Sequence, residues 1–203
     1  MYKIIRTFIA AFALLFSFNS FALYDMSNPY TLAKDVATGT IEKIKANKDK
    51  INDKDFAEKL IQDELLPYID IKYAAYKVIG TSLKTTSAEE RDRFTEVFSE
   101  YMKKNFVTVL SKYTDQDIIP TEHKDVGAND NLVSVKLLIR ESGKKDLEMI
   151  LKLRKNNKTG EWKAFDLIGE NISMLDAKIS EISPIIKNQG INAAIEKLRA
   201  EMK

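Results

Sequence analysis

The spacing of apolar residues changes twice along the chain and divides it into three blocks. Up to about residue 113, apolar side chains recur every three or four residues, which is the period of an amphipathic helix. Between about 117 and 168 they alternate with polar ones, as in a half-buried strand. The helical period returns from Ser173 to the C-terminus. This order predicts an α+β domain with helices packed on one face of a curved antiparallel sheet.

Capping signals set the limits of three predicted helices in the first block. A helix over about residues 29–47 begins after Asn28, because Asn accepts hydrogen bonds from the free N–H groups of a first turn and Pro suits the next position. A second helix, over about 55–66, ends before Pro67, since a residue that precedes proline avoids helical geometry. A third covers about 69–80, and its last residue is glycine, a common helix end.

The longest predicted helix begins at Ser87 and continues for about 26 residues, to Tyr113. Ser87 and Glu90 form a capping box at its start. Apolar residues at three- and four-residue steps give it an aromatic-rich stripe that includes Phe98 and Tyr101, while the opposite face is charged. The helix should therefore bury one side and expose the other.

The alternating block predicts an antiparallel meander of four strands. Residues 133–139 and 147–153 have an apolar side chain at every second position, and the turn at Gly143 separates them. A third strand follows over 161–168 after a hairpin turn, and a weaker one precedes them over 117–122. These strands supply the sheet of the predicted domain.

The last block predicts two further helices. The first begins after Ser173, is bent at Pro184 and ends at Gly190, since proline disturbs a helix interior and glycine often ends one. The second covers about 191–202 and is amphipathic. No internal repeat or linker interrupts the pattern, so we expect a single domain.

Residues 1–22 are interpreted as a cleaved signal peptide. Two basic residues precede an uncharged apolar run over 7–18, and Ser20 and Ala22 supply the small residues that signal peptidase requires. The run is shorter than the roughly 20 residues of a membrane-spanning helix, although an uncleaved anchor is the alternative. Cleavage after Ala22 leaves 23–203 as one domain. The chain contains no Cys, which excludes a lipoprotein anchor and disulfides.

Removal of the leader changes the charge of the protein. The whole chain has 32 basic and 30 acidic residues, and the leader contains the basic residues Lys3 and Arg6 and no acidic one. The remaining domain is therefore neutral, with 30 residues of each sign. Because binding to phosphate backbones needs a basic excess, this balance argues against nucleic acid as a partner.

The sequence offers little catalytic chemistry. His123 is the only histidine and lies in a polar stretch, and a chain without Cys that has one His cannot build a zinc site of the usual composition. Asp166 alternates with Trp162, Ala164 and Ile168, which would place a carboxylate among apolar groups, where it could act as a base. Alternatively, its neighbours point inward while Asp166 pairs with a surface Lys or caps a loop. No nucleophile, metal or phosphate-loop motif appears, and we expect no cofactor.

Several short segments remain that this chemistry does not explain. They are Asn28-Pro-Tyr30, the apolar stretch Glu64–Gly80, Ser87-x-x-x-Arg91-x-x-Phe94-x-x-x-Phe98, Trp162-Lys-Ala-Phe-Asp166, Glu170-Asn-Ile-Ser-Met174 and Gly190-Ile191. In this order they resemble the MlaC family, also called the toluene-tolerance auxiliary protein family, which comprises periplasmic phospholipid carriers of the maintenance-of-lipid-asymmetry pathway. The resemblance covers the chain after the leader. It departs at Asn171, where the family usually has Gly, but Asn is the best substitute in left-handed backbone.

The resemblance implies a fold similar to the nuclear-transport-factor cone, in which helices and sheet enclose a deep apolar pocket for acyl tails. It implies a monomeric periplasmic carrier that moves phospholipid between an inner-membrane ABC transporter complex and an outer-membrane lipoprotein–porin complex. An isomerase-like or hydrolytic enzyme that uses Asp166, and an adaptor module with a filled core, are the alternatives.

The alternations above supply candidates for the pocket lining. They are Val135, Leu137, Met149 and Leu151 on the sheet, Phe98, Tyr101 and Met102 on the long helix, and Tyr73, Tyr76 and Val78 at a lid or mouth. Each could equally be an ordinary core residue, because a cavity and a filled core have the same alternation. Lys72 and Lys77 could meet a lipid phosphate at the mouth or lie solvated.

Overall fold

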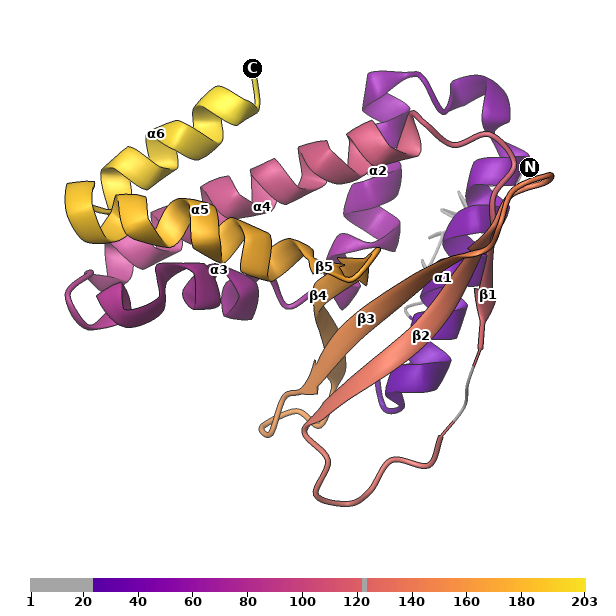
Figure 1. Ribbon diagram of the computed structural model, residues 1–203, viewed down its shortest axis with the longest axis horizontal. Helices are drawn as coiled ribbons and strands as arrows, with labels where there is room; N and C mark the ends of the chain where they lie inside the picture. The colour runs from indigo at the N-terminus through magenta and orange to yellow at the C-terminus, as the bar shows by residue number, and fades with distance from the viewer. Residues whose placement is uncertain (1–23, 122–123) are drawn as a thin grey trace, which may run out of the picture.

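Residues 24–121 and 124–203 are described by the computed structural model, in which helices flank an open antiparallel sheet (Figure 1). The α-helices are α1 (Pro29–Ala46), α2 (Lys54–Glu64), α3 (Ile71–Ile79), α4 (Ala88–Leu110), α5 (Met174–Gln189) and α6 (Ile191–Glu201). Short 3-10 helices η1 (Lys48–Lys50), η2 (Leu66–Tyr68) and η3 (Gly80–Lys84) connect them. The α+β prediction is confirmed. The predicted leader and His123 lie outside the described residues.

The sheet has the order β1-β2-β3-β4-β5, and each strand is antiparallel to its neighbour. The strands are β1 (Asp117–Pro120), β2 (Leu132–Arg140), β3 (Leu147–Lys155), β4 (Trp162–Gly169) and β5 (Ile172–Ser173). The predicted meander is present, and the two-residue strand β5 is added to it, too short to show a period of its own.

A bulge in β4 changes which residues share a face. Lys152 lies opposite Asp166, but the next residue of β3, Leu153, lies opposite Ala164, so Phe165 is the extra residue. Because of this extra residue, the β4 residues before and after the bulge point to opposite faces from those that an uninterrupted alternation would give. The prediction that Asp166 shares a face with Trp162 and Ala164 is therefore wrong.

Local capping explains where the helices begin. The Asn28 side chain accepts hydrogen bonds from the N–H groups of Tyr30 (2.9 Å) and Thr31 (3.1 Å). Ser87 and Glu90 form the predicted capping box of α4. The predicted helix over 69–80 begins later than expected, because Pro67 lies inside η2 and Asp70 then caps α3. Pro184 lies inside α5, which continues past it to Gln189.

Three apolar clusters stabilise the fold. The helical cluster joins α3, α4, α5 and α6 around fully buried residues such as Phe94 and Ile182. The sheet cluster packs α1 against the sheet around Leu137 and Trp162. The α2 cluster joins α1, α2 and the end of α4 around Ile61. Figure 1 shows the helices of the helical cluster on one side of the molecule and α1 behind β1 and β2 on the other.

Residues 24–26 contact three elements, η2, β4 and α1. The Tyr24 N–H donates to the Tyr68 hydroxyl (3.0 Å), and the Trp162 N–H donates to the Met26 carbonyl (2.7 Å). The Tyr24 hydroxyl lies so close to Gly39 of α1 that a Cβ there would be 1.8 Å from it, which explains a glycine inside this helix. No helix within residues 24–121 or 124–203 has the length and apolar character needed to span a membrane.

Candidate functional site

The predicted helical residues of the pocket lining belong to the helical cluster. Val78 and Phe98 are buried in it, with 0% and 3% of their surface exposed. Tyr76, Tyr101 and Met102 are half-buried and pack against its edge. Their position fits a core residue and a pocket wall equally well, so their role in lipid binding stays a prediction.

The predicted sheet residues form a second group. Leu137 of β2 lies opposite Met149 of β3, and Val135 lies opposite Leu151. Val135 and Leu137 are buried, whereas Met149 and Leu151 are half-buried. Directly opposed residues share a face of a sheet, so the four side chains lie together as the alternation predicted. They belong to the sheet cluster, and thus to a different cluster from Phe98.

Tyr73 lies outside both groups and takes part in an ordered stack of side chains. The guanidinium carbon of Arg154 lies 4.4 Å from the centroid of the Tyr73 ring, in a cation–π contact. The edge of one ring meets the face of the other where Tyr73 contacts Phe165, at 5.1 Å between centroids and 83° between planes. Tyr73 therefore lies where α3 meets β3 and β4.

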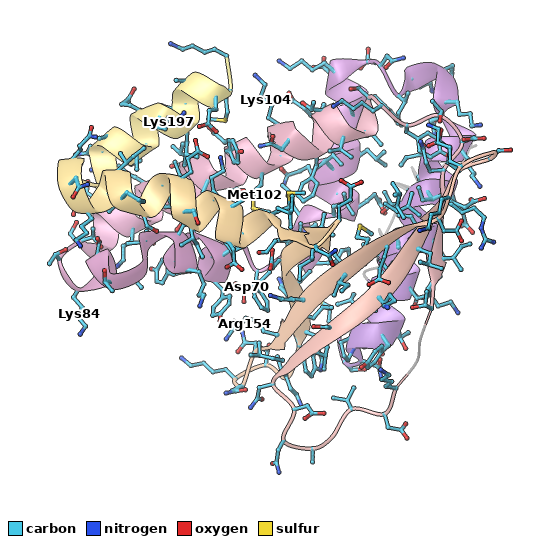
Figure 2. The ribbon with its side chains drawn as sticks, in the orientation of Figure 1. Asp70, Lys84, Met102, Lys104, Arg154 and Lys197 are labelled. Atoms are coloured by element: carbon cyan, nitrogen blue, oxygen red, sulfur yellow. The ribbon has the colours of Figure 1, made fainter. Side chains whose placement is uncertain are left out.

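Asp70 fixes the same junction. Its Oδ1 accepts a hydrogen bond from the N–H of Tyr73 (3.0 Å) and caps α3, while its Oδ2 accepts one from Arg154 (2.5 Å). Its own N–H donates to the carbonyl of Ala164 in β4 (2.7 Å). Figure 2 shows Asp70 and Arg154 next to one another at the end of β3. Sequence reasoning did not select this pair, although Asp before a helix is a common capping signal.

A polar pocket opens beside this pair. We call it the Arg154 pocket; its volume is about 440 Å³. Its lining residues come from the η2–α3 junction, α4, β3, β4 and the hairpin between the two strands: Ile69, Asp70, Ile71, Lys72, Thr95, Glu96, Ser99, Arg154, Asn156, Glu161 and Lys163. Lys72, one of the two lysines proposed for a lipid phosphate, lines it, and Lys77 does not.

Asp166 is occupied by structural contacts. It is 7% exposed, its Oδ1 accepts from the N–H of Leu175 (3.0 Å), and its Oδ2 accepts from the hydroxyl of Ser173 (2.8 Å). The Lys152 ammonium lies 3.5 Å from Oδ2. Both contacts of the non-catalytic alternative are present, the lysine and the cap. The carboxylate connects β4 to the start of α5, which disfavours its use as a base.

Metal chemistry gains no support from the side chains that can be placed. Within residues 24–121 and 124–203, no group of three or more His, Asp or Glu side chains is arranged to hold a metal ion.

A group of four alternating charges joins α5 to α6. The Lys178 ammonium lies 2.6 Å from Glu181 and 3.1 Å from Glu201, and Lys197 contacts the same two carboxylates at 3.3 and 3.0 Å. Hydrogen bonding to Lys178 lowers the pKa of Glu181 to about 2. Burial opposes the charge on Lys178, but hydrogen bonds to Glu181, Tyr101 and Glu201 raise its pKa above the usual value. Lys178 also lies 4.4 Å from the centroid of the Tyr101 ring, so the group fixes one predicted lining residue in place.

Comparison with known proteins assigns this chain to a family. The family model described as MlaC protein matches residues 34–200. The chain belongs to the MlaC family. It is 34% identical over 175 residues to the "Intermembrane phospholipid transport system binding protein MlaC" of Haemophilus influenzae, covering 85% of this chain and 81% of the relative.

The fold of this MlaC-family chain is also similar to that of a solved structure. A phospholipid-binding protein from Ralstonia solanacearum, solved in complex with a phospholipid, superposes with a TM-score of 0.76. The match covers 86% of this chain and 97% of the other at 14% identity, so it concerns the fold. The departure from the family pattern at Asn171 is accommodated as expected, since Glu170 and Asn171 adopt φ of 51° and 64° in the turn before β5.

Proposed function

We propose that this chain is a soluble periplasmic carrier that binds the acyl tails of a phospholipid and moves the lipid between two membranes. Its partners are an inner-membrane ABC transporter complex and an outer-membrane lipoprotein–porin complex. The observation that carries the proposal is the family match over residues 34–200, with a relative named for intermembrane phospholipid transport. The similar fold of a phospholipid-binding protein supports it.

The energetics of lipid transfer explain why such a protein needs little polar chemistry. Two acyl tails contain roughly 30 methylenes, each worth ~0.8 kcal/mol on leaving water, so free transfer across water is opposed by on the order of 25 kcal/mol. A carrier whose interior is as apolar as a bilayer makes both ends of the transfer nearly equal in energy. Exchange then depends only on the barrier at a docked partner, and the carrier needs no catalytic group.

The proposed wall on the sheet is where the four apolar side chains of β2 and β3 lie together. Leu137 is fully buried, and Met149, directly opposite, is half-buried. One residue of this pair is therefore packed in the core, while the other is accessible at its edge. Tails that lie along β3 would extend the sheet cluster. A bulky side chain at either position would occupy their volume.

The first test is mass spectrometry of the purified mature protein under native conditions. We expect co-purified phospholipid, and lipid-free protein from several expression hosts would refute the carrier function. Leu137→Trp and Met149→Trp should then reduce the bound lipid, with circular dichroism to verify folding. Leu132→Trp is the matched control on β2, because Leu132 is 62% exposed. Full loading of folded Met149→Trp protein would refute the proposed wall while leaving the carrier function intact.

A further inference from the structure

The Arg154 pocket combines charges of both signs in a small volume. Three cationic side chains, Lys72, Arg154 and Lys163, line it. We propose that it binds the zwitterionic headgroup of a phospholipid, a phosphodiester that carries an amine, as in phosphatidylethanolamine. The inference rests on the carrier function proposed above and adds the class of headgroup.

The three cationic side chains retain N–H groups that can donate hydrogen bonds to a phosphate. Within the described residues, the Arg154 guanidinium makes one hydrogen bond, to Asp70, and is held against the Tyr73 ring. Lys163 makes no ion pair in the part of the chain that the structure describes. Lys72 is 65% exposed, and its ion pair with Asp92 is long, at 3.7 Å. An oriented guanidinium with free N–H groups is the donor that recognises phosphate best, and a lysine adds charge.

The acidic side chains of the pocket select against an anionic headgroup. Asp70 is already paired with Arg154, whereas Glu96 and Glu161 make no ion pair within the described residues and face the same pocket. Three acids balance three cations there, so a headgroup with net negative charge would leave carboxylates without a counterion. A zwitterion satisfies both signs, with the phosphate at Arg154 and the amine at Glu96.

One face of α4 leads from this polar pocket to apolar surroundings. Thr95 and Ser99 line the pocket, and Met102 and Phe106 follow at helical spacing on the same stripe. Met102 packs against the helical cluster and Phe106 against the α2 cluster, and both are half-buried. A lipid whose head lies at Ser99 would therefore place one of its tails beside Met102, a predicted lining residue of α4.

The apolar residues that line the pocket also connect it to apolar surroundings. Ile69 and Ile71 line it and also pack against the α2 cluster, and Ile71 contacts the helical cluster as well. The pocket thus borders the place where the two clusters meet. Its volume of about 440 Å³ is near the lower limit of ligand pockets, about 300–1,000 Å³, which suits a headgroup rather than two acyl chains.

The test is a competition between headgroups with matched tails. Lipid-stripped mature protein is incubated with vesicles of equimolar phosphatidylethanolamine and phosphatidylglycerol with identical acyl chains, and the bound lipids are quantified by mass spectrometry. We expect a three- to tenfold enrichment of phosphatidylethanolamine, which is about 0.7–1.4 kcal/mol. Glu96→Lys makes the pocket cationic and should reverse the preference toward phosphatidylglycerol. Lys163→Glu should instead weaken the retention of both lipids.

Glu100→Lys is the matched control, since Glu100 is an exposed residue one turn further along α4 that does not line the pocket. An unchanged lipid ratio in folded, lipid-loaded Glu96→Lys protein, or an equal shift in Glu100→Lys, would overturn the headgroup site while the carrier function stands. Failure of the wild-type protein to take up either lipid would instead overturn the carrier function. Glycerophosphoethanolamine, which has no tails, should compete only weakly; strong binding of it together with an unchanged lipid ratio would assign the pocket to a free phosphodiester and refute the proposal.

Discussion

Replacement of Asp70 by Asn should destabilise the protein, because it removes the charge from the Arg154 pair while keeping a helix cap. Both side chains are mostly buried, with 20% and 28% of their surface exposed, and the hydrogen bond is short and charge-assisted. Such bonds contribute about 1.5–3 kcal/mol, and Asn caps a helix as well as Asp does. We expect a loss of about 2 kcal/mol for Asp70→Asn. Asp70→Ala also removes the cap and should lose about 3 kcal/mol.

A second Arg–Asp pair on the same sheet provides the control. Asp146 accepts two hydrogen bonds from Arg140, at 3.1 and 2.8 Å, so its geometry is better than that of the Asp70 pair. Arg140 is 57% exposed, however, and exposed pairs contribute about 0.2–1 kcal/mol. Asp146→Asn should therefore destabilise the protein clearly less than Asp70→Asn, because burial matters more than geometry here.

Urea unfolding of the protein comprising residues 23–203 at neutral pH measures these differences. Asp70→Asn should lower the midpoint at an unchanged slope, and its melting temperature should fall by about 4–8 °C. A double-mutant cycle with Arg154→Met should give a coupling of about 1–2 kcal/mol. If Asp146→Asn is as destabilising as Asp70→Asn, or if the coupling is near zero, the junction between α3 and β3 does not depend on this pair and the reasoning is refuted.

Two further predictions concern other carboxylates. The pKa of Glu181 is lowered to about 2 in the folded state, so its stabilisation is complete above about pH 5 and is lost as the pH falls toward 2. Because Glu181 is 37% exposed, we discount this contribution to about 1–2 kcal/mol; Glu181→Gln should flatten the dependence of the urea midpoint on pH between 7 and 3, and parallel curves would contradict the assignment. Asp166→Asn should lose about 1–3 kcal/mol, because its amide nitrogen cannot accept and replaces one of the two oxygens that accept from Ser173 and Leu175, while bound lipid in mass spectra stays unchanged. Loss of lipid without loss of stability would show that Asp166 acts on the ligand instead.

The elements that the sequence predicted well are those fixed by local physics. Asn28 and Ser87 start helices because a side-chain oxygen satisfies N–H groups two or three residues away, and no distant partner is needed. The alternation in β2 and β3 follows from the pleat of a strand and correctly grouped Leu137 with Met149. The same reasoning placed Asp166 on the wrong face of β4. The bulge beside it depends on the pairing of β4 with β3, and the spacing of apolar residues does not indicate it.

The sequence by itself determined the order of elements, the ends of most helices, the near balance of 32 basic and 30 acidic residues, and the resemblance to the MlaC family. It also placed Val78 and Leu137 among the apolar positions that could line a pocket or fill a core. Only the tertiary structure decided what those side chains contact: Val78 and Leu137 are equally buried, yet they belong to different clusters. It also brought Asp70 together with Arg154, 84 residues away. The period of a helix or strand indicates which of its faces is apolar, whereas contact depends on how distant elements pack, and no short-range pattern encodes that.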